Sequence, residues 1–231
     1  MLSKHCFLGF LVTFFLTGET ETQPNCDSLK PQKVHFQSRN FHNILHWQSG
    51  IGCTSNSSFY TVQYKIYGEK SWTNKESCSN IQQVFCDLTD ETSLVQESYY
   101  GRVRMNSMGI PSDWVITKRF TPCWETKIDS PFMNLTRSNQ SLLVSLGAPN
   151  LPDRAPKEKT MSMEDYYELV YRVFITNKFL KKEQMIYEGT HRVVEIEAVA
   201  PHMSYCVVAE MYQPMFDRRS QRSKKICVEI S

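Results

Sequence analysis

Short alternating runs of apolar and polar residues dominate the chain from residue 31 onward. In the run 60–67, every second side chain is apolar and would lie on one face of a strand, with Tyr60 and Val62 among them. Tyr67 falls on the opposite face, so we expect its ring to be exposed. Similar runs lie at 34–36, 44–47, 84–88, 100–105, 114–120, 142–146, 167–175, 184–187, 191–196, 205–211 and 226–230. Short runs of this kind, separated by Gly, Asn, Ser and Pro turns, predict an all-β sandwich architecture.

The pattern occurs twice, which predicts two tandem sandwiches. Residues 122–130 have little apolar pattern and are flanked by turn-forming residues, so we interpret them as a linker between domains at 26–121 and 131–231. Tyr205 follows Val199 by six residues with a proline between them, which is the spacing of a tyrosine corner. Leu94 and Tyr100 have the same separation, which favours a repeat over a chance core tyrosine.

The first residues have the composition of a signal peptide. A cation at Lys4 precedes a short apolar run at 6–16 and small residues, which predicts a signal peptide at 1–21 with cleavage between Gly18 and Thr22. The run is too short to span a bilayer. The alternative to a signal peptide is a buried N-terminal strand or helix. With no second apolar stretch before Ser231, we expect a secreted, soluble protein without a membrane anchor.

Sequons and cysteines agree with export. Asn-x-Ser/Thr triplets predict glycans at Asn56, Asn134 and Asn139. Of eight cysteines, Cys6 lies in the signal peptide, and the remaining seven in an oxidising compartment favour disulfides over metal sites. The sequence has no Cys-x-x-Cys and no histidine spacing that suits zinc, so we expect no metal and no cofactor.

Charge and motifs exclude several function classes. The chain carries 26 Lys+Arg and 24 Asp+Glu, and this near balance argues against nucleic acid or lipid as a partner. Gly-x-Ser-x-Gly, His-Glu-x-x-His and Cys-Gly-Ser-Cys motifs are absent from the sequence, which predicts that the protein is not an enzyme. A basic run could hold heparin-like glycans, although a solvated face is the simpler reading. It consists of Arg218, Arg219, Arg222, Lys224 and Lys225.

The segment 31–47, with its Pro-Gln-Lys-Val-His-Phe opening and Trp47, resembles the extracellular module of class II helical-cytokine receptors, a pair of fibronectin type III domains. The cysteine placement matches as well, and the resemblance covers essentially the whole mature chain. It implies two disulfides, one between Cys78 and Cys86 and one between Cys206 and Cys227. Three cysteines lie outside this pattern. Cys26 and Cys53 would fall at the same end of the first sandwich and could pair, which leaves Cys123 either buried or in an intermolecular bridge.

The resemblance also implies a partner, namely a helical cytokine of the interleukin-10 class, with interleukin-22 the expected ligand. A monomeric soluble receptor of this kind would act as a decoy that withholds the cytokine from its signalling receptor. The alternative is an adhesion or matrix-binding module, although the sequence contains no Arg-Gly-Asp.

Sandwich topology brings loops of both domains to one elbow, where we expect the cytokine to bind. These loops are 38–41, 67–72, 90–97, 150–165 and 213–219. Tyr67 offers a large apolar face, Gly68 allows close backbone approach, and the resemblance places this pair against a cytokine helix. Phe216 is expected either at an exposed loop tip or packed on its own sandwich. The expected contact residues are Tyr67, Gly68, Glu69, Lys70, Glu91, Arg119, Met163, Glu164, Pro214, Met215 and Phe216.

Overall fold

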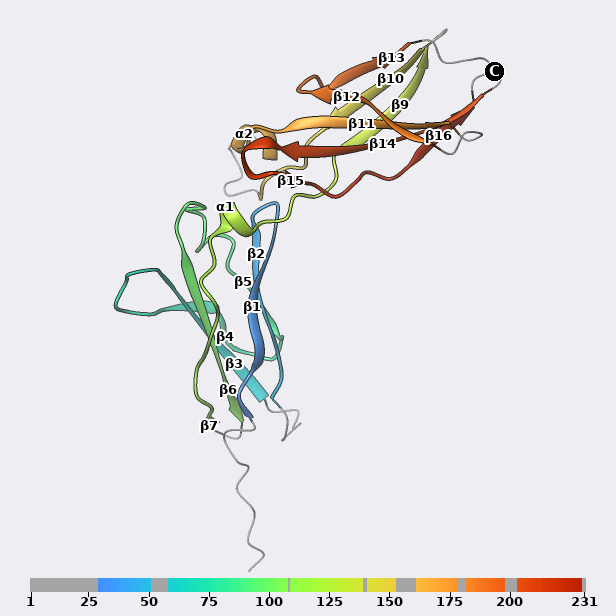
Figure 1. Ribbon diagram of the computed structural model, residues 1–231. Helices are drawn as coiled ribbons and strands as arrows, with labels where there is room; N and C mark the ends of the chain where they lie inside the picture. The colour runs from blue at the N-terminus through green and yellow to red at the C-terminus, as the bar shows by residue number, and fades with distance from the viewer. Residues whose placement is uncertain are drawn as a thin grey trace, which may run out of the picture.

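Two β-sandwiches are joined end to end at an angle, with a short helical turn between them (Figure 1). The computed structural model describes residues 29–50, 58–107, 109–138, 141–152, 161–177, 182–197 and 203–229. The predicted signal peptide therefore lies outside the described residues, as do Cys26, Cys53, Asn56 and Asn139. The all-β fold is confirmed. Among the described residues, no helix has the length and apolar character needed to cross a membrane.

The first sandwich consists of strands β1 to β8. They are β1 (Gln32–Arg39), β2 (His42–Gln48), β3 (Ser58–Ile66), β4 (Thr73–Ile81), β5 (Phe85–Asp87), β6 (Tyr99–Ser107), β7 (Ile110–Pro111) and β8 (Val115–Ile116). One sheet has the order β1-β2-β5, and the other has the order β4-β3-β6-β7 with β8 also paired to β6. The predicted alternation in 60–67 is confirmed, because Tyr60 and Val62 are buried in the core whereas Tyr67 is 59% exposed.

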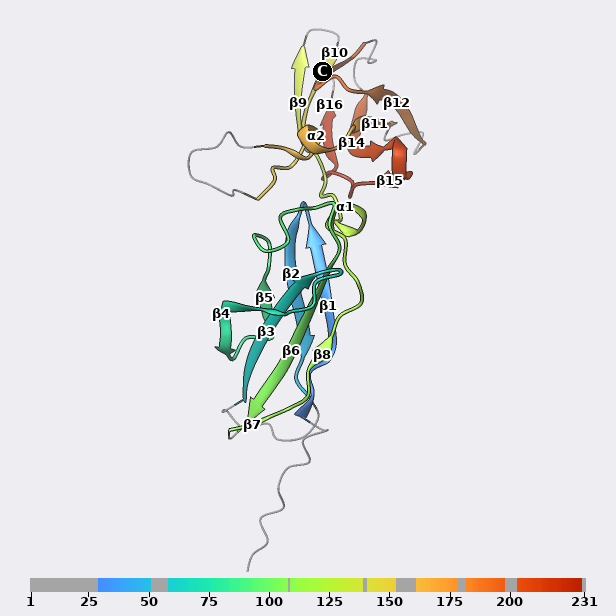
Figure 2. The same ribbon diagram turned by 90° about the vertical axis from the view of Figure 1, so that its left-hand side faces the viewer.

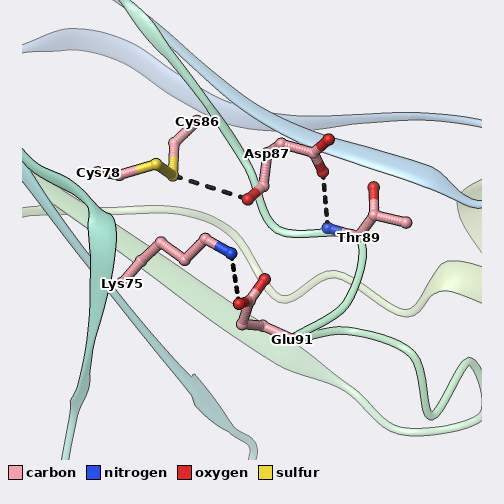
Figure 3. Close-up of a disulfide and its surroundings, with 6 residues drawn as sticks. All are labelled: Lys75, Cys78, Cys86, Asp87, Thr89 and Glu91. Carbon is pink, nitrogen blue, oxygen red and sulfur yellow. Dashed lines mark hydrogen bonds and ion pairs between the residues drawn. A yellow bond between two sulfur atoms is a disulfide. The ribbon is translucent and has the colours of Figure 1, made fainter. Parts of the chain in front are cut away.

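A disulfide between Cys78 and Cys86 joins the two sheets of the first sandwich, because β4 belongs to one sheet and β5 to the other (Figure 3). The sequence did not predict β4, whose residues Thr73–Ile81 are almost all polar. This strand lies at the edge of its sheet, where only β3 pairs with it, and Cys78 is its one buried residue, so it adds little apolar surface to the core.

The second sandwich consists of strands β9 to β16. They are β9 (Phe132–Ser138), β10 (Ser141–Gly147), β11 (Val170–Asn177), β12 (Glu183–Gly189), β13 (Val193–Ile196), β14 (Ser204–Gln213), β15 (Arg218–Arg219) and β16 (Ile226–Glu229). One sheet has the order β13-β10-β9, and the other has the order β12-β11-β14-β15 with β16 also paired to β14. Cys206 and Cys227 are directly opposite on β14 and β16 and form the second disulfide. The two cysteines are 21 residues apart in the sequence, and closing a loop of that length stabilises the sandwich by about 3 kcal/mol in the chain-entropy model.

The tyrosine corner of the first sandwich is formed by Tyr99 and not, as the spacing predicted, by Tyr100. The Tyr99 hydroxyl donates a hydrogen bond to the Leu94 carbonyl at 3.1 Å, and its ring is buried. Alternation along β6 decides between the neighbours, because Tyr99 shares the inward face with Val103 while Tyr100 lies on the outward face. Leu94, which the spacing paired with Tyr100, is five residues before Tyr99 and accepts its hydrogen bond. In the second sandwich, Val199 lies outside the described residues.

Candidate functional site

The connection between the sandwiches is anchored by α1 (Pro122–Glu125), where the sequence predicted an irregular linker. Proline at the first position suits a helix start because its missing N–H would have no partner there. The Cys123 amide donates to the Val95 carbonyl at 2.9 Å, and its thiol donates to Gln96 Oε1 at 3.3 Å. Cys123 is a buried free cysteine, the first of the two expected states, and burial raises the pKa of its thiol, which keeps it protonated and unreactive.

One hydrophobic cluster continues from the first sandwich through α1 into the second. Phe41, Val95 and Cys123 pack into the same buried cluster as the core of the second sandwich. The Phe41 ring lies edge-on to Tyr166 at 4.9 Å and against Tyr167 at 5.6 Å between ring centroids. A shared core of this kind restrains the domains far more than a polar interdomain contact would.

Asp129 fastens the segment after α1 to the β1–β2 turn. Its carboxylate forms an ion pair with Arg39 and accepts a hydrogen bond from the side-chain amide of Asn40 at 2.9 Å. The Asp129 amide in turn donates to Asn40 Oδ1 at 2.9 Å. These bonds hold the turn that carries Phe41, so the ring enters the joint in one orientation.

Arg218 on β15 binds the C-terminal carbonyls of α1. Its guanidinium donates to the Trp124 carbonyl at 2.7 Å and to the Cys123 carbonyl at 3.2 Å. The Tyr167 hydroxyl donates to the same Cys123 carbonyl at 2.7 Å. Helix-end carbonyls lack partners within a helix, so these donors satisfy them and fix the second sandwich to α1.

The proton on Tyr167 links the joint to pH. Burial raises the pKa of its phenol to about 12, above the value of about 10 for an exposed tyrosine. The folded state holds this proton more tightly, so its contribution to stability is fully present below pH 10 and is lost as the pH rises through 12. Between those values, we expect the free energy of unfolding to fall by about 1–2 kcal/mol more in the wild type than in Tyr167→Phe. Urea unfolding at each pH measures this difference, and parallel curves for the two proteins would contradict it.

The structure places Tyr67 beside the start of α1. Its amide donates to the Ser98 carbonyl at 2.7 Å, and the Ser98 hydroxyl lies 2.7 Å from that of Thr121, which immediately precedes α1. The Tyr67 ring lies 5.5 Å from the Arg119 guanidinium and 6.2 Å from the Tyr100 ring. The expected exposure of Tyr67 is confirmed, and Arg119 lies exposed next to it.

Gly68 allows the tight turn after β3. The Glu69 amide donates to the Ile66 carbonyl at 3.2 Å, and Gly68 has φ +91°, a conformation that a type II turn requires at this position and that favours glycine. The Glu69 carboxylate accepts a hydrogen bond from the Ile66 amide at 3.1 Å, which closes the turn. Gly68, Glu69 and Lys70 are all exposed at its surface.

Next to Cys123 and Trp124 of α1, exposed apolar side chains border an open depression of about 380 Å³. Trp124 is 59% exposed and Met215 is 76% exposed. Phe216 is half-buried and meets the Trp124 ring edge-on at 4.7 Å. Of the two expected positions for Phe216, the packed one is therefore found and the exposed loop tip is not. The depression is lined by Gln96, Cys123, Trp124, Tyr166, Tyr167, Glu168, Gln213, Met215 and Phe216.

The structure corrects the expected role of Met163. This residue begins α2 (Met163–Tyr166) and is 0% exposed within the shared core, so the prediction that it contacts a partner is wrong. Its neighbour Glu164 is largely buried and forms an ion pair with Arg192. Glu91 is likewise engaged by Lys75 (Figure 3), whereas Pro214 is exposed at the start of a 3-10 turn, Pro214–Phe216.

Sequence reasoning missed two exposed apolar residues near the joint. Trp124 was assigned to an irregular linker, and Leu94, which is also exposed, was read only as part of a tyrosine corner. The signal for Trp124 was present, because a tryptophan beside a helix-starting proline in a polar connection has no sandwich core to enter.

Comparison with known proteins identifies the family. The model "Tissue factor" matches residues 7–114, and "Interferon-alpha/beta receptor, fibronectin type III" matches residues 126–231. The chain is 58% identical to human interleukin-22 receptor subunit alpha-2 and 60% identical to the rat protein, with 100% and 99% of this chain and 100% of each relative covered. The chain belongs to the class II cytokine receptor family. As in that family of receptors, it is not an enzyme.

More distant relatives share the same architecture. Human interleukin-20 receptor subunit alpha is 36% identical over 86% of this chain and 36% of its own length. The crystal structure of the chicken interferon gamma receptor alpha chain superposes with a TM-score of 0.68 and 23% identity, covering 88% of this chain and 98% of that one. This last similarity confirms the pair of fibronectin type III domains.

Proposed function

We propose that this class II cytokine receptor is a secreted decoy that binds interleukin-22 at the joint between its domains and withholds it from the signalling receptor. The observation that carries the proposal is the placement of exposed Tyr67, Trp124 and Met215 around α1. Exposed apolar side chains gathered at one place favour a partner that covers them. Tyrosine, tryptophan and methionine are also enriched in protein interfaces.

The choice of ligand follows from the relatives. Proteins that are 58–60% identical over their full length are named as interleukin-22 receptor subunit alpha-2. A helical cytokine would cover about 800 Å² on each partner, which is enough to span the β3–β4 turn, α1 and the Pro214–Phe216 turn. The packing between the domains supports this proposal, because a pre-ordered site loses less entropy on binding.

The remaining features of the proposal concern the mature protein. We expect it to be a monomer without an anchor, with its first domain at 26–121 and its second at 131–231. Asn134 is exposed on β9, which suits a glycan there. The expected contact residues that are exposed remain the proposed binding set. They are Tyr67, Gly68, Glu69, Lys70, Arg119, Pro214 and Met215.

Calorimetric titration of the purified chain against a panel of helical cytokines tests this function. We expect one-to-one binding, with interleukin-22 bound at least about tenfold more tightly than other members of the panel, a difference of about 1.4 kcal/mol. In a competition assay, the chain should reduce binding of interleukin-22 to immobilised interleukin-22 receptor subunit alpha-1. No heat with any cytokine, together with retention on extracellular matrix, would instead favour the adhesion alternative.

A further inference from the structure

A stack of alternating cations and indoles lies on the outward face of β3 and β6, separate from the contacts around α1. The Arg102 guanidinium lies 4.2 Å from the Trp72 ring centroid and 4.3 Å from that of Trp114. Arg104 stacks on Trp114 at 4.6 Å, and Lys65 on Trp72 at 5.1 Å. We call these five residues the cation–indole stack.

The register of the sheet explains why these side chains meet. Arg102 is paired with Gln63 on β3, and the inward face of β6 carries the buried Val103 between the two arginines. Arg102 and Arg104 therefore point outward on the same face and are about 7 Å apart along the strand. All five members of the stack are half-buried, so each retains contact with solvent.

Within the described part of the chain, the positive charges of the stack have no acidic partner. Among the described residues, none of its three cations forms an ion pair. Arg102 donates to the neutral amide of Gln63, and Lys65 donates to the main-chain oxygen of Glu69 at 2.9 Å. The nearby carboxylate of Asp113 is taken by Lys30 at 2.9 Å. Burial and the neighbouring Arg104 lower the pKa of Arg102, as expected where like charges lie together.

The basic run that the sequence offered as a glycan site is organised differently. Arg222 is neutralised by Glu183 and Glu210. The Arg218 guanidinium donates its hydrogen bonds to the carbonyls of α1 and to the side chain of Gln213. The uncompensated cations of this protein therefore include a pre-ordered group on the first sandwich, which no run of basic letters in the sequence reveals.

We infer that the cation–indole stack binds a sulfated glycosaminoglycan chain of the heparan sulfate type. The Arg104 guanidinium, stacked on Trp114, can donate paired hydrogen bonds to a sulfate group, whereas Arg102 already donates to Gln63. Cations in a row on an open sheet face suit a linear polyanion, and the indoles offer apolar surface to the sugar rings between sulfates. A protein of the extracellular space, as proposed above, meets this polymer rather than nucleic acid.

The position of the Arg104 end of the stack permits both ligands at once. β3, β6 and β8 run along the first sandwich away from α1 (Figure 2), and Arg104 pairs with Thr61 in the middle of β3, well before the Tyr67 turn. A chain held on the pericellular matrix through this face would still present its joint to a cytokine. The inference concerns a second ligand, so it stands or falls independently of the cytokine proposal.

Surface plasmon resonance on immobilised heparin dodecasaccharide tests the inference. We expect Lys65→Gln with Arg104→Gln to weaken binding at least about tenfold, because two charge-assisted contacts are removed. The matched control, Lys224→Gln with Lys225→Gln, removes the same charge from the basic run and should stay within about twofold of the wild type, since a distant charge acts only through screened fields. Arg102 is left in place, because it holds Gln63 within the sheet, and thermal melting confirms that both variants fold. If the double variant melts early, Arg104→Gln alone gives the comparison.

Further arms separate sulfate recognition from other causes. The wild type should bind neither desulfated heparin nor phosphatidylserine vesicles at the same concentration. Equal binding to either, an unaffected stack variant, or an equal loss in the control variant would overturn the inference. Cytokine affinity of the Arg104→Gln variant should equal that of the wild type, whereas loss of both ligands would contradict two separate sites. Lys65 is left unchanged in this arm, because its ammonium bonds the Glu69 carbonyl in the turn proposed to contact the cytokine.

Discussion

Replacing Tyr67 with alanine is expected to weaken cytokine binding by at least about 2 kcal/mol, or about 30-fold in the dissociation constant. The ring is exposed but not loose, because its backbone is bonded to Ser98 and its face lies near Arg119. A tyrosine that is ordered before binding loses little entropy when a partner covers it. Surface plasmon resonance with immobilised cytokine measures the change.

The matched control is Phe85→Ala. Phe85 is also an exposed aromatic side chain, but it lies on β5, in the sheet opposite β3. Its removal should change cytokine affinity by less than about 0.5 kcal/mol, as for surface residues outside an interface. If a folded Tyr67→Ala protein binds as tightly as the wild type, the assignment of the β3–β4 turn to the interface is wrong.

Replacing Phe41 with alanine is expected to lower the free energy of unfolding by about 3–4 kcal/mol, the range for a large buried aromatic ring. Phe41 is fully buried, and its ring fills the space between α1 and the pair Tyr166 and Tyr167. Its φ of 64° lies in the left-handed region, which alanine occupies with similar strain, so the loss reflects the missing ring rather than the backbone. Urea unfolding measures the change in stability.

The same variant should also loosen the angle between the domains. Small-angle X-ray scattering is expected to show a broader distribution of interatomic distances for Phe41→Ala, and cytokine affinity should fall because the site is no longer pre-ordered. Phe132→Ala removes an exposed phenylalanine at the start of β9 and should alter neither the distribution of interatomic distances nor the cytokine affinity. An unchanged scattering curve with an unchanged urea midpoint would show that the shared cluster does not fix the joint.

Local patterns in the sequence predicted those features that depend on one strand or one family likeness. The alternation in 60–67 placed Tyr60 and Val62 in the core and Tyr67 at the surface. The family resemblance supplied both disulfides, and the odd cysteine count pointed to a free Cys123. The exposure of Tyr67 and the unpaired thiol follow from side-chain periodicity and from cysteine number, both of which a single sequence contains, whereas the disulfide pairing came from the resemblance. The choice between Tyr99 and Tyr100 was missed although the sequence carried it, because the alternation of Val103 and Met105 with Arg102 and Arg104 places Tyr99 on the inward face.

Features that depend on contacts between distant segments could not be predicted in the same way. Met163 lies in a polar segment that reads as a loop, yet the packing of α2 against the shared core buries it. Phe41 follows Asn40 in a turn of the first sandwich, but its ring completes the core of the second.

The buried cluster that runs through α1 has a consequence for anyone who divides this receptor into fragments. A cut between the sandwiches would remove the contacts of Phe41 and Val95 with the cluster that contains Tyr167 and would expose apolar surface on each fragment. Either half alone would therefore tend to self-associate, although each has complete sheets. The two sandwiches together are thus the smallest fragment that can be expressed with this cluster buried, and engineered versions should keep both sandwiches in one chain.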